Sequence, residues 1–158
     1  LVGHSLGGLY MQLFARRYPE DMAALVLVDA TGPVRFKGKP IREHWPLWFR
    51  VLFSLFAPTI AQEELDALDV TGEAVLALPT VTGKPVIILS ANDWLGDTSE
   101  EGRDATEYHN DFVRLYPGCT HIWVESGHDI PNDNPDAVIA AIRDVLARVS
   151  PSVMNQRK

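Results

Sequence analysis

The clearest candidates for chemistry stand at the start of the chain, in the stretch GHSLG at positions 3–7. The stretch fits the pattern G-x-S-x-G, in which a serine occupies a sharp turn between a strand and a helix. We expect glycines two residues either side of the serine because bulkier side chains would collide in this strained turn. The turn exposes the serine hydroxyl and directs the N–H groups of the helix N-terminus at negative charge that forms beside it. The spacing therefore predicts a nucleophile at Ser5.

A serine nucleophile needs a base, and the chain has five histidines. His128 follows the last predicted strand, in a glycine-containing loop before a helix, where a side chain reaches the carboxyl edge of a sheet. A lone loop histidine is ordinarily a surface residue. His4 precedes the serine, but on so tight a turn its side chain is expected to point away from the Ser5 hydroxyl. The others have no matching motif: His44, His109 and His121.

Several aspartates could supply the acid that orients such a base. Asp29 ends the stretch LVLVDA, and Asp93 lies just past VIILSA; Asp97 and Asp104 follow on the same connection. An acid in this role fixes the tautomer of the imidazole and stabilises the imidazolium. Aspartates at these places are also common helix caps and turn residues. The residues alone therefore leave the choice of acid open.

Three apolar runs predict the strands that must position these groups: Ala24–Val28, Val86–Leu89 and His121–Val124. Continuous apolar runs are typical of strands that are covered on both faces, as in a parallel sheet. Helical spacing occupies the segments between and after them, and the last helix has Asn134 as a predicted N-cap and Pro135 at its first position. Thr98 and Glu101 have the spacing of a capping box. The alternation predicts an α/β fold with a doubly wound, mostly parallel sheet.

The segment 33–83 is too long for an ordinary connection and contains helix signals such as AQEELDAL. We expect a helical cap there, inserted into a core formed by residues 1–32 and 84–158. The aromatic run in this segment is apolar nearly all round, which indicates either a buried or subunit-facing helix or a lid that lines a substrate pocket. Its members are Trp45, Trp48, Phe49, Phe53 and Phe56.

Two stretches resemble the α/β-hydrolase-fold serine hydrolases. GHSLGGLYMQLFARRYPEDMAALVLVDA resembles the nucleophile elbow, following helix and next strand, and SGHDIPNDNPDAVIAAIRDVL resembles the histidine loop and last helix. The resemblance covers nearly all of the chain outside the cap. It implies Ser5 as nucleophile and His128 as base, in the chain order serine, acid, histidine. It most often places the acid at Asp93, and Asp29 is the alternative because some relatives take the acid from the earlier strand.

The resemblance also implies an oxyanion hole in which the backbone N–H of Leu6 is one donor. The second donor normally comes from a loop after an earlier strand, and several strands normally precede the elbow. We therefore expect a C-terminal part of a longer protein, without roughly the first third to half of the fold. The implied reaction is cleavage of an ester-like bond in a small apolar molecule through an acyl-serine, with no metal or organic cofactor.

Composition excludes some other classes. The formal net charge of −7 disfavours nucleic acid as a partner, and the single cysteine, Cys119, gives neither an internal disulfide nor metal-ligand spacing. The most apolar stretch, WPLWFRVLFSLFAP, is interrupted by Arg50 and is shorter than the roughly 20 residues that a bilayer requires. The same fold also serves thioesterases, acyltransferases, cofactor-free haloperoxidases and carbon–carbon bond hydrolases. A non-catalytic binding relative is a further alternative, against which the intact pair of Ser5 and His128 argues.

Overall fold

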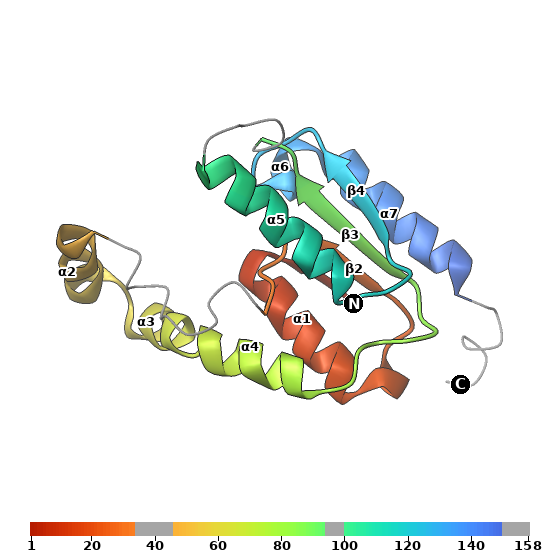
Figure 1. Ribbon diagram of the computed structural model, residues 1–158, viewed down its shortest axis with the longest axis horizontal. Coiled ribbons are helices and arrows are strands. Elements are labelled where there is room, and N and C mark those ends of the chain that lie inside the picture. The colour runs from red at the N-terminus through yellow and green to blue at the C-terminus, as the bar shows by residue number, and fades with distance from the viewer. Residues whose placement is uncertain (34–45, 94–99, 150–158) are drawn as a thin grey trace.

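Four parallel strands form the centre of the computed structural model, which describes residues 1–33, 46–93 and 100–149, with backbone alone at residues 49, 100–105 and 111. Within these residues the strands lie in the order β1-β2-β3-β4 (Figure 1). Each pairs with the next in parallel. Their bounds are Val2–His4 for β1, Leu25–Val28 for β2, Val86–Ala91 for β3 and Thr120–Val124 for β4.

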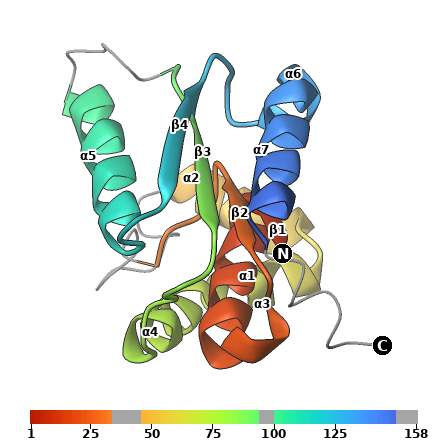
Figure 2. The ribbon, with the colours of Figure 1, turned by 90° about the vertical axis from the view of Figure 1, so that its right-hand side faces the viewer.

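Helices cover both faces of this sheet, which explains why β2 and the first four residues of β3 are continuous apolar runs. All residues of these two strands are buried. On β2, Leu25 and Leu27 face a cluster with residues of α1 (Ser5–Arg17) and α5 (Glu100–Arg114), whereas Val26 and Val28 face α7 (Pro135–Arg148). Figure 2 shows α5 and α7 on opposite sides of the strands. The predicted α/β fold with a doubly wound parallel sheet is confirmed.

The helix ends follow the signals in the sequence. Helix α1 ends at Arg17, and Pro19 starts a short 3-10 helix, η1 (Pro19–Asp21). After the short α6 (Ile130–Asp133), α7 begins with Pro135 at its first position. The Asn134 side chain caps it by accepting a hydrogen bond of 3.3 Å from the N–H of Ala137. Helix α5 begins at Glu100, and Thr98 of the predicted capping box lies outside the described residues.

The described part of the segment 33–83 is helical. It contains α2 (Leu47–Phe56), α3 (Thr59–Asp66) and α4 (Leu68–Ala77). Helix α4 packs on α1 through a small apolar cluster that has Leu9, Leu68 and Val75 at its centre. In Figure 1, α4 lies beside α1, and α2 is the helix farthest from the sheet. The role of these helices as a cap stays a prediction.

Helix α2 exposes most of its apolar side chains. Trp48 is 67% exposed, and five further apolar residues of this helix are also exposed: Leu47, Val51, Leu52, Leu55 and Phe56. The prediction that α2 is a helix buried within the chain is therefore wrong. That α2 forms a subunit contact or a lid stays a prediction. In the part of the chain that the structure describes, no helix has both the length and the apolar character to cross a membrane.

Candidate catalytic site

Three segments of the chain meet at the carboxyl edge of the sheet. Ser5 directly follows β1, Asp29 directly follows β2, and His128 lies in the loop after β4. Parallel strands end at one edge, so these side chains converge although they are far apart in sequence. The Nε2 atom of His128 lies 3.0 Å from the Ser5 Oγ, and its Nδ1 atom lies 2.6 Å from the Asp29 Oδ2. The three groups form a hydroxyl–imidazole–carboxylate chain.

The serine sits on a strained turn, as the motif indicates. Ser5 has a φ of 51°, in the left-handed region that residues with a side chain rarely occupy. A Cβ atom at Gly3 would lie 2.7 Å from the Cα of Gly8 and 2.8 Å from the carbonyl oxygen of Gly7. The space for the elbow therefore requires glycine at position 3.

The prediction that a side chain at the second motif glycine, Gly7, would collide with its neighbours is wrong. A Cβ atom at Gly7 would have no neighbour within 4 Å in the described residues. The restricted position is Gly8, where a Cβ atom would lie 2.2 Å from the Cβ of Ala30. The reason is packing between elements, because the first turn of α1 lies against the segment that follows β2.

The carboxylate that contacts His128 in the structure is that of Asp29, the alternative candidate, and not that of Asp93. Asp29 has a φ of 38°. Its backbone N–H donates to the Leu89 carbonyl oxygen at 2.7 Å, and its Oδ1 accepts from the Ala91 N–H at 3.0 Å. The carboxylate is thus held between β2 and β3, with only 11% of its side chain exposed.

Asp93 is exposed, and no hydrogen bond or ion pair joins it to His128. It lies two residues beyond the end of β3, and β3 is one strand farther from Ser5 than β2. The neighbouring Asn92 accepts a hydrogen bond of 3.4 Å from the N–H of Ser126, in the loop that carries His128. The segment after β3 therefore supports the histidine loop, whereas the carboxylate comes from β2.

Leu6 is the second residue of α1, so its N–H belongs to the first turn, where backbone donors have no acceptor within the helix. No side chain caps this end of α1. The Leu6 side chain packs toward the cluster of Leu9 and Leu68. This arrangement leaves a backbone donor beside Ser5 and an apolar surface next to it.

Two histidines without a predicted role lie against the three central groups. His4 donates from Nε2 to the backbone carbonyl oxygen of His128 at 2.8 Å, and the two rings are 4.9 Å apart. His109 on α5 places Nε2 3.9 Å from the Asp29 Oδ1. A signal for His109 exists in the sequence: it stands three residues before Phe112 and seven before Tyr116, on the apolar face of α5.

The remaining histidines lie elsewhere. His121 on β4 is hydrogen-bonded to the Ser90 hydroxyl at 3.0 Å. Its pKa is lowered by burial and, to a smaller extent, by the charge of His109. His44 lies outside the described residues.

The predicted pocket aromatics are described only in part. Trp48 is an exposed residue of α2 and Phe53 is half-buried. Trp45 and the side chain of Phe49 lie outside what the structure describes. A role for these residues in a substrate pocket stays a prediction.

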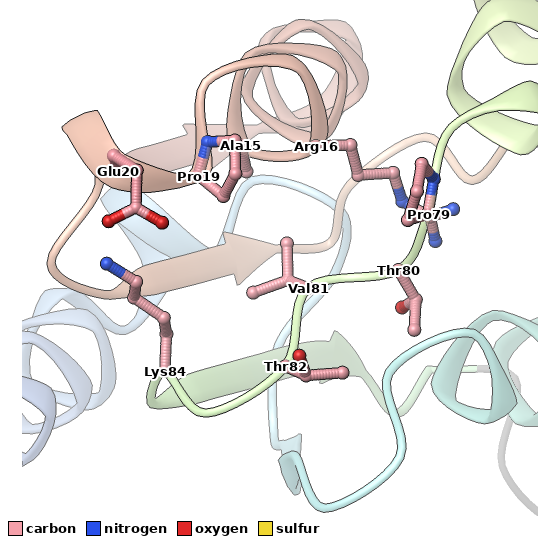
Figure 3. A pocket seen from close by; sticks show the side chains of 9 residues that line it. All are labelled: Ala15, Arg16, Pro19, Glu20, Pro79, Thr80, Val81, Thr82 and Lys84. Carbon is pink, nitrogen blue, oxygen red and sulfur yellow. The ribbon is translucent and has the colours of Figure 1, made fainter.

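A separate hollow of about 290 Å³ lies at the other end of the sheet (Figure 3). Its residues precede β2 and β3, whereas Ser5 and Asp29 follow their strands. Arg16 lines one end, and Glu20 and Lys84 face each other at the other end. The Arg16 guanidinium donates to the backbone carbonyl oxygens of α4 and its C-terminal cap, at Val75 and Leu78. This contact anchors α4 to α1.

Comparison with known proteins identifies the fold. No protein-family model matches the chain, and no curated protein matches it in sequence. Solved structures do match, among them mouse alpha/beta hydrolase domain-containing protein 10, with a TM-score of 0.56 and 20% identity over 95% of this chain and 62% of that one. A probable hydrolytic enzyme from Pseudomonas aeruginosa PAO1 has a TM-score of 0.51 and 20% identity, over 92% of this chain and 62% of that one.

NosK from Streptomyces actuosus also matches, with a TM-score of 0.51 and 20% identity over 94% of this chain and 69% of that one. These likenesses show that the chain has the α/β-hydrolase fold. The chain spans 62% of the length of the mouse protein and of the Pseudomonas enzyme.

Proposed function

We propose that this chain carries the catalytic triad of a serine hydrolase that cleaves a carboxylic ester, or a related acyl bond, in a small apolar molecule. The proposal depends on one observation: His128 contacts the Ser5 hydroxyl at 3.0 Å with one ring nitrogen and the Asp29 carboxylate at 2.6 Å with the other. A hydroxyl, an imidazole and a carboxylate in this order are the arrangement that a catalytic triad needs, which supports the proposal. The α/β-hydrolase fold supports the proposal as an analogy.

Asp29 selects the reactive form of His128. The Asp29 carboxylate at 2.6 Å accepts a hydrogen bond from the Nδ1–H group, so the proton of the neutral ring stays on Nδ1 and the lone pair on Nε2 faces the Ser5 hydroxyl. As the Ser5 Oγ attacks the carbonyl carbon, its proton moves to Nε2, and Asp29 stabilises the imidazolium that forms. The backbone N–H of Leu6 donates to the oxyanion.

The second half of the reaction returns the enzyme to its starting state. The imidazolium gives its proton to the leaving alcohol as the carbon–oxygen bond of the ester breaks, which leaves the acyl group on Ser5. His128 then removes a proton from water, the resulting hydroxide attacks the acyl carbon, and the carboxylic acid leaves as the Ser5 oxygen is reprotonated. The His128 side chain is 60% exposed, so water has access to this step.

The preference for an apolar acyl or alcohol group is supported by the surface beside Ser5. Leu6, next to the nucleophile, packs into the apolar cluster that joins α1 to α3 and α4. Helix α2, in the same insertion, exposes further apolar side chains. We include the helices of segment 33–83 in the proposal as a cap that supplies apolar contacts to the substrate.

The test uses the full-length gene product in wild-type form and with Ser5→Ala. Each protein is treated with a fluorophosphonate probe and with nitrophenyl esters of short and long acyl chains. We expect labelling and turnover in the wild type, and loss of both in the variant, because only Ser5 provides the nucleophilic oxygen. Equal labelling of the two proteins would reject Ser5 as the nucleophile.

A further inference from the structure

The Asp29 carboxylate lies between two imidazole rings. Its Oδ2 is 2.6 Å from Nδ1 of His128, and its Oδ1 is 3.9 Å from Nε2 of His109. The two histidines come from different elements, the loop after β4 and the helix α5. A three-residue triad accounts for only one of these contacts.

Asp29 occupies a backbone conformation that the surrounding structure must hold. Its φ of 38° is costly for a residue with a side chain. The N–H of Ala91 fixes Oδ1 from the side of β3 at 3.0 Å. His109 lies near the same oxygen from the side of α5, and its own side chain is 11% exposed. The orientation of Oδ2 toward His128 therefore depends on what holds Oδ1.

His109 is itself fixed by aromatic packing. Its ring lies edge-on to Trp123 of β4, with 5.3 Å between the ring centroids and an angle of 73°. Tyr108, the preceding residue of α5, makes a second edge contact at 5.3 Å. The titratable groups near His109 include Asp29 after β2, His121 on β4 and Tyr108.

We propose that His109 is a positioning residue of the triad, whose ring lies beside Oδ1 of Asp29, limits the movement of this carboxylate and shares its charge with His128. This inference rests on the proposed function, because it assigns Asp29 as the acid. The two imidazoles then compete for one negative charge. A positive charge on His109 offsets the field that favours the His128 imidazolium, so protonation of one ring opposes protonation of the other.

Two substitutions distinguish the effect of His109 on the position of the Asp29 carboxylate from the effect of its charge. His109→Phe keeps a flat ring against Trp123 but removes the nitrogen near Oδ1, and His109→Gln restores an N–H donor that cannot carry charge. The full-length gene product is used, and folding is checked by circular dichroism. The pKa of His128 is measured by NMR titration, and kcat and KM are measured over a range of pH.

For His109→Phe we expect the pKa of His128 to rise by about 0.5 or more, because a second imidazole no longer competes for the charge of Asp29. The acid limb of kcat/KM moves to higher pH by the same amount, and kcat falls by about 3- to 10-fold with KM nearly unchanged. His109→Gln recovers most of kcat but keeps the raised pKa. The difference between the two variants distinguishes an effect of His109 on the position of the Asp29 carboxylate from an effect on its charge.

His121→Phe is the matched control. His121 also contacts the ring of Trp123, with 4.8 Å between centroids, but its hydrogen bond is to Ser90 and not to Asp29. We expect a clearly smaller change in the pKa of His128 than in His109→Phe, because His121 acts on Asp29 only through His109. An unchanged pKa in His109→Phe, or the same shift in His121→Phe, would overturn the inference.

The NMR titration does not depend on turnover, so the two proposals fail in different ways. If His128 shifts as expected but no turnover depends on Ser5, the proposed hydrolase function is wrong and the coupling of the two histidines stands. If Ser5-dependent turnover is present but the His109 variants match wild type, only the coupling is wrong.

Discussion

At the scale of single residues, the geometry places the Asp29 carboxylate beside His128, whereas the resemblance most often places the acid at Asp93. Asp29→Asn should lower kcat by about 10²- to 10⁴-fold, because an amide favours the wrong tautomer of His128 and cannot stabilise its charged form. Asp93→Asn is the matched control and should stay within about twofold of wild type. Steady-state kinetics on a nitrophenyl ester measures both. A large loss of kcat in Asp93→Asn, together with a near-normal kcat in Asp29→Asn, would show that Asp93 is the acid.

His4 joins the elbow to the histidine loop, through a hydrogen bond of 2.8 Å to the His128 carbonyl oxygen and through contact of the two rings. His4→Phe keeps the ring and loses the donor, and His4→Gln does the reverse. If the hydrogen bond holds His128 near Ser5, kcat should fall by about 10-fold in His4→Phe and by much less in His4→Gln. Equal kcat values for the two variants would show that the donor has no such role.

The sequence is informative about Ser5 and His128 because each stands in a local motif that a turn or loop requires. It could not choose between Asp29 and Asp93, since an aspartate follows each of two neighbouring strands. The choice depends on distances across the sheet and on the left-handed backbone of Asp29, which no spacing reveals. The contact of His109 with Asp29 could not be predicted for a similar reason, because the two residues are 80 positions apart in the chain.

At the scale of elements, the contact between α1 and the segment after β2 depends on Gly8. Gly8→Ala would place a Cβ atom 2.2 Å from that of Ala30, so we expect a loss of about 1–3 kcal/mol in the free energy of unfolding. Gly7→Ala is the matched control, because its Cβ atom would enter open space. Urea denaturation measures both variants. Similar midpoints would contradict the close packing at position 8.

Strands and helices could be predicted well where burial and caps impose a pattern. The strands β2 and β3 are buried on both faces, and therefore β2 and the first four residues of β3 form unbroken apolar runs. Asn134 with Pro135 marks the start of α7. The environment of α2 could not be predicted, because an apolar helix has the same pattern whether it is buried or exposed. In the structure most of its apolar side chains are exposed.

At the scale of the whole molecule, a buried tyrosine links α1 to the end of α5. The Tyr116 hydroxyl donates to the Gln12 Oε1 at 3.0 Å, and burial raises the pKa of Tyr116 to about 12, although Arg16 acts in the opposite direction. The folded protein therefore holds this proton more tightly than the unfolded chain. This contribution to stability is complete below the ordinary pKa of 10.0 and is lost as the pH rises through about 12.

The urea midpoint of the wild type should therefore fall between pH 10 and about 12 more steeply than that of Tyr116→Phe. The variant starts from a lower stability because it lacks the hydrogen bond to Gln12, so the two slopes are compared and not the absolute midpoints. Parallel slopes would show that ionisation of Tyr116 does not limit stability in alkali.

The central claim is that Ser5 becomes covalently acylated while His128 and Asp29 activate it. The most direct measurement is mass spectrometry of the full-length gene product after treatment with a fluorophosphonate, followed by proteolysis and mapping of the adduct. We expect one adduct, on the peptide that contains Ser5 and at its hydroxyl oxygen, with formation strongly slowed in Asp29→Asn. An adduct on another residue, or none at a probe concentration that saturates a known serine hydrolase, would contradict the claim.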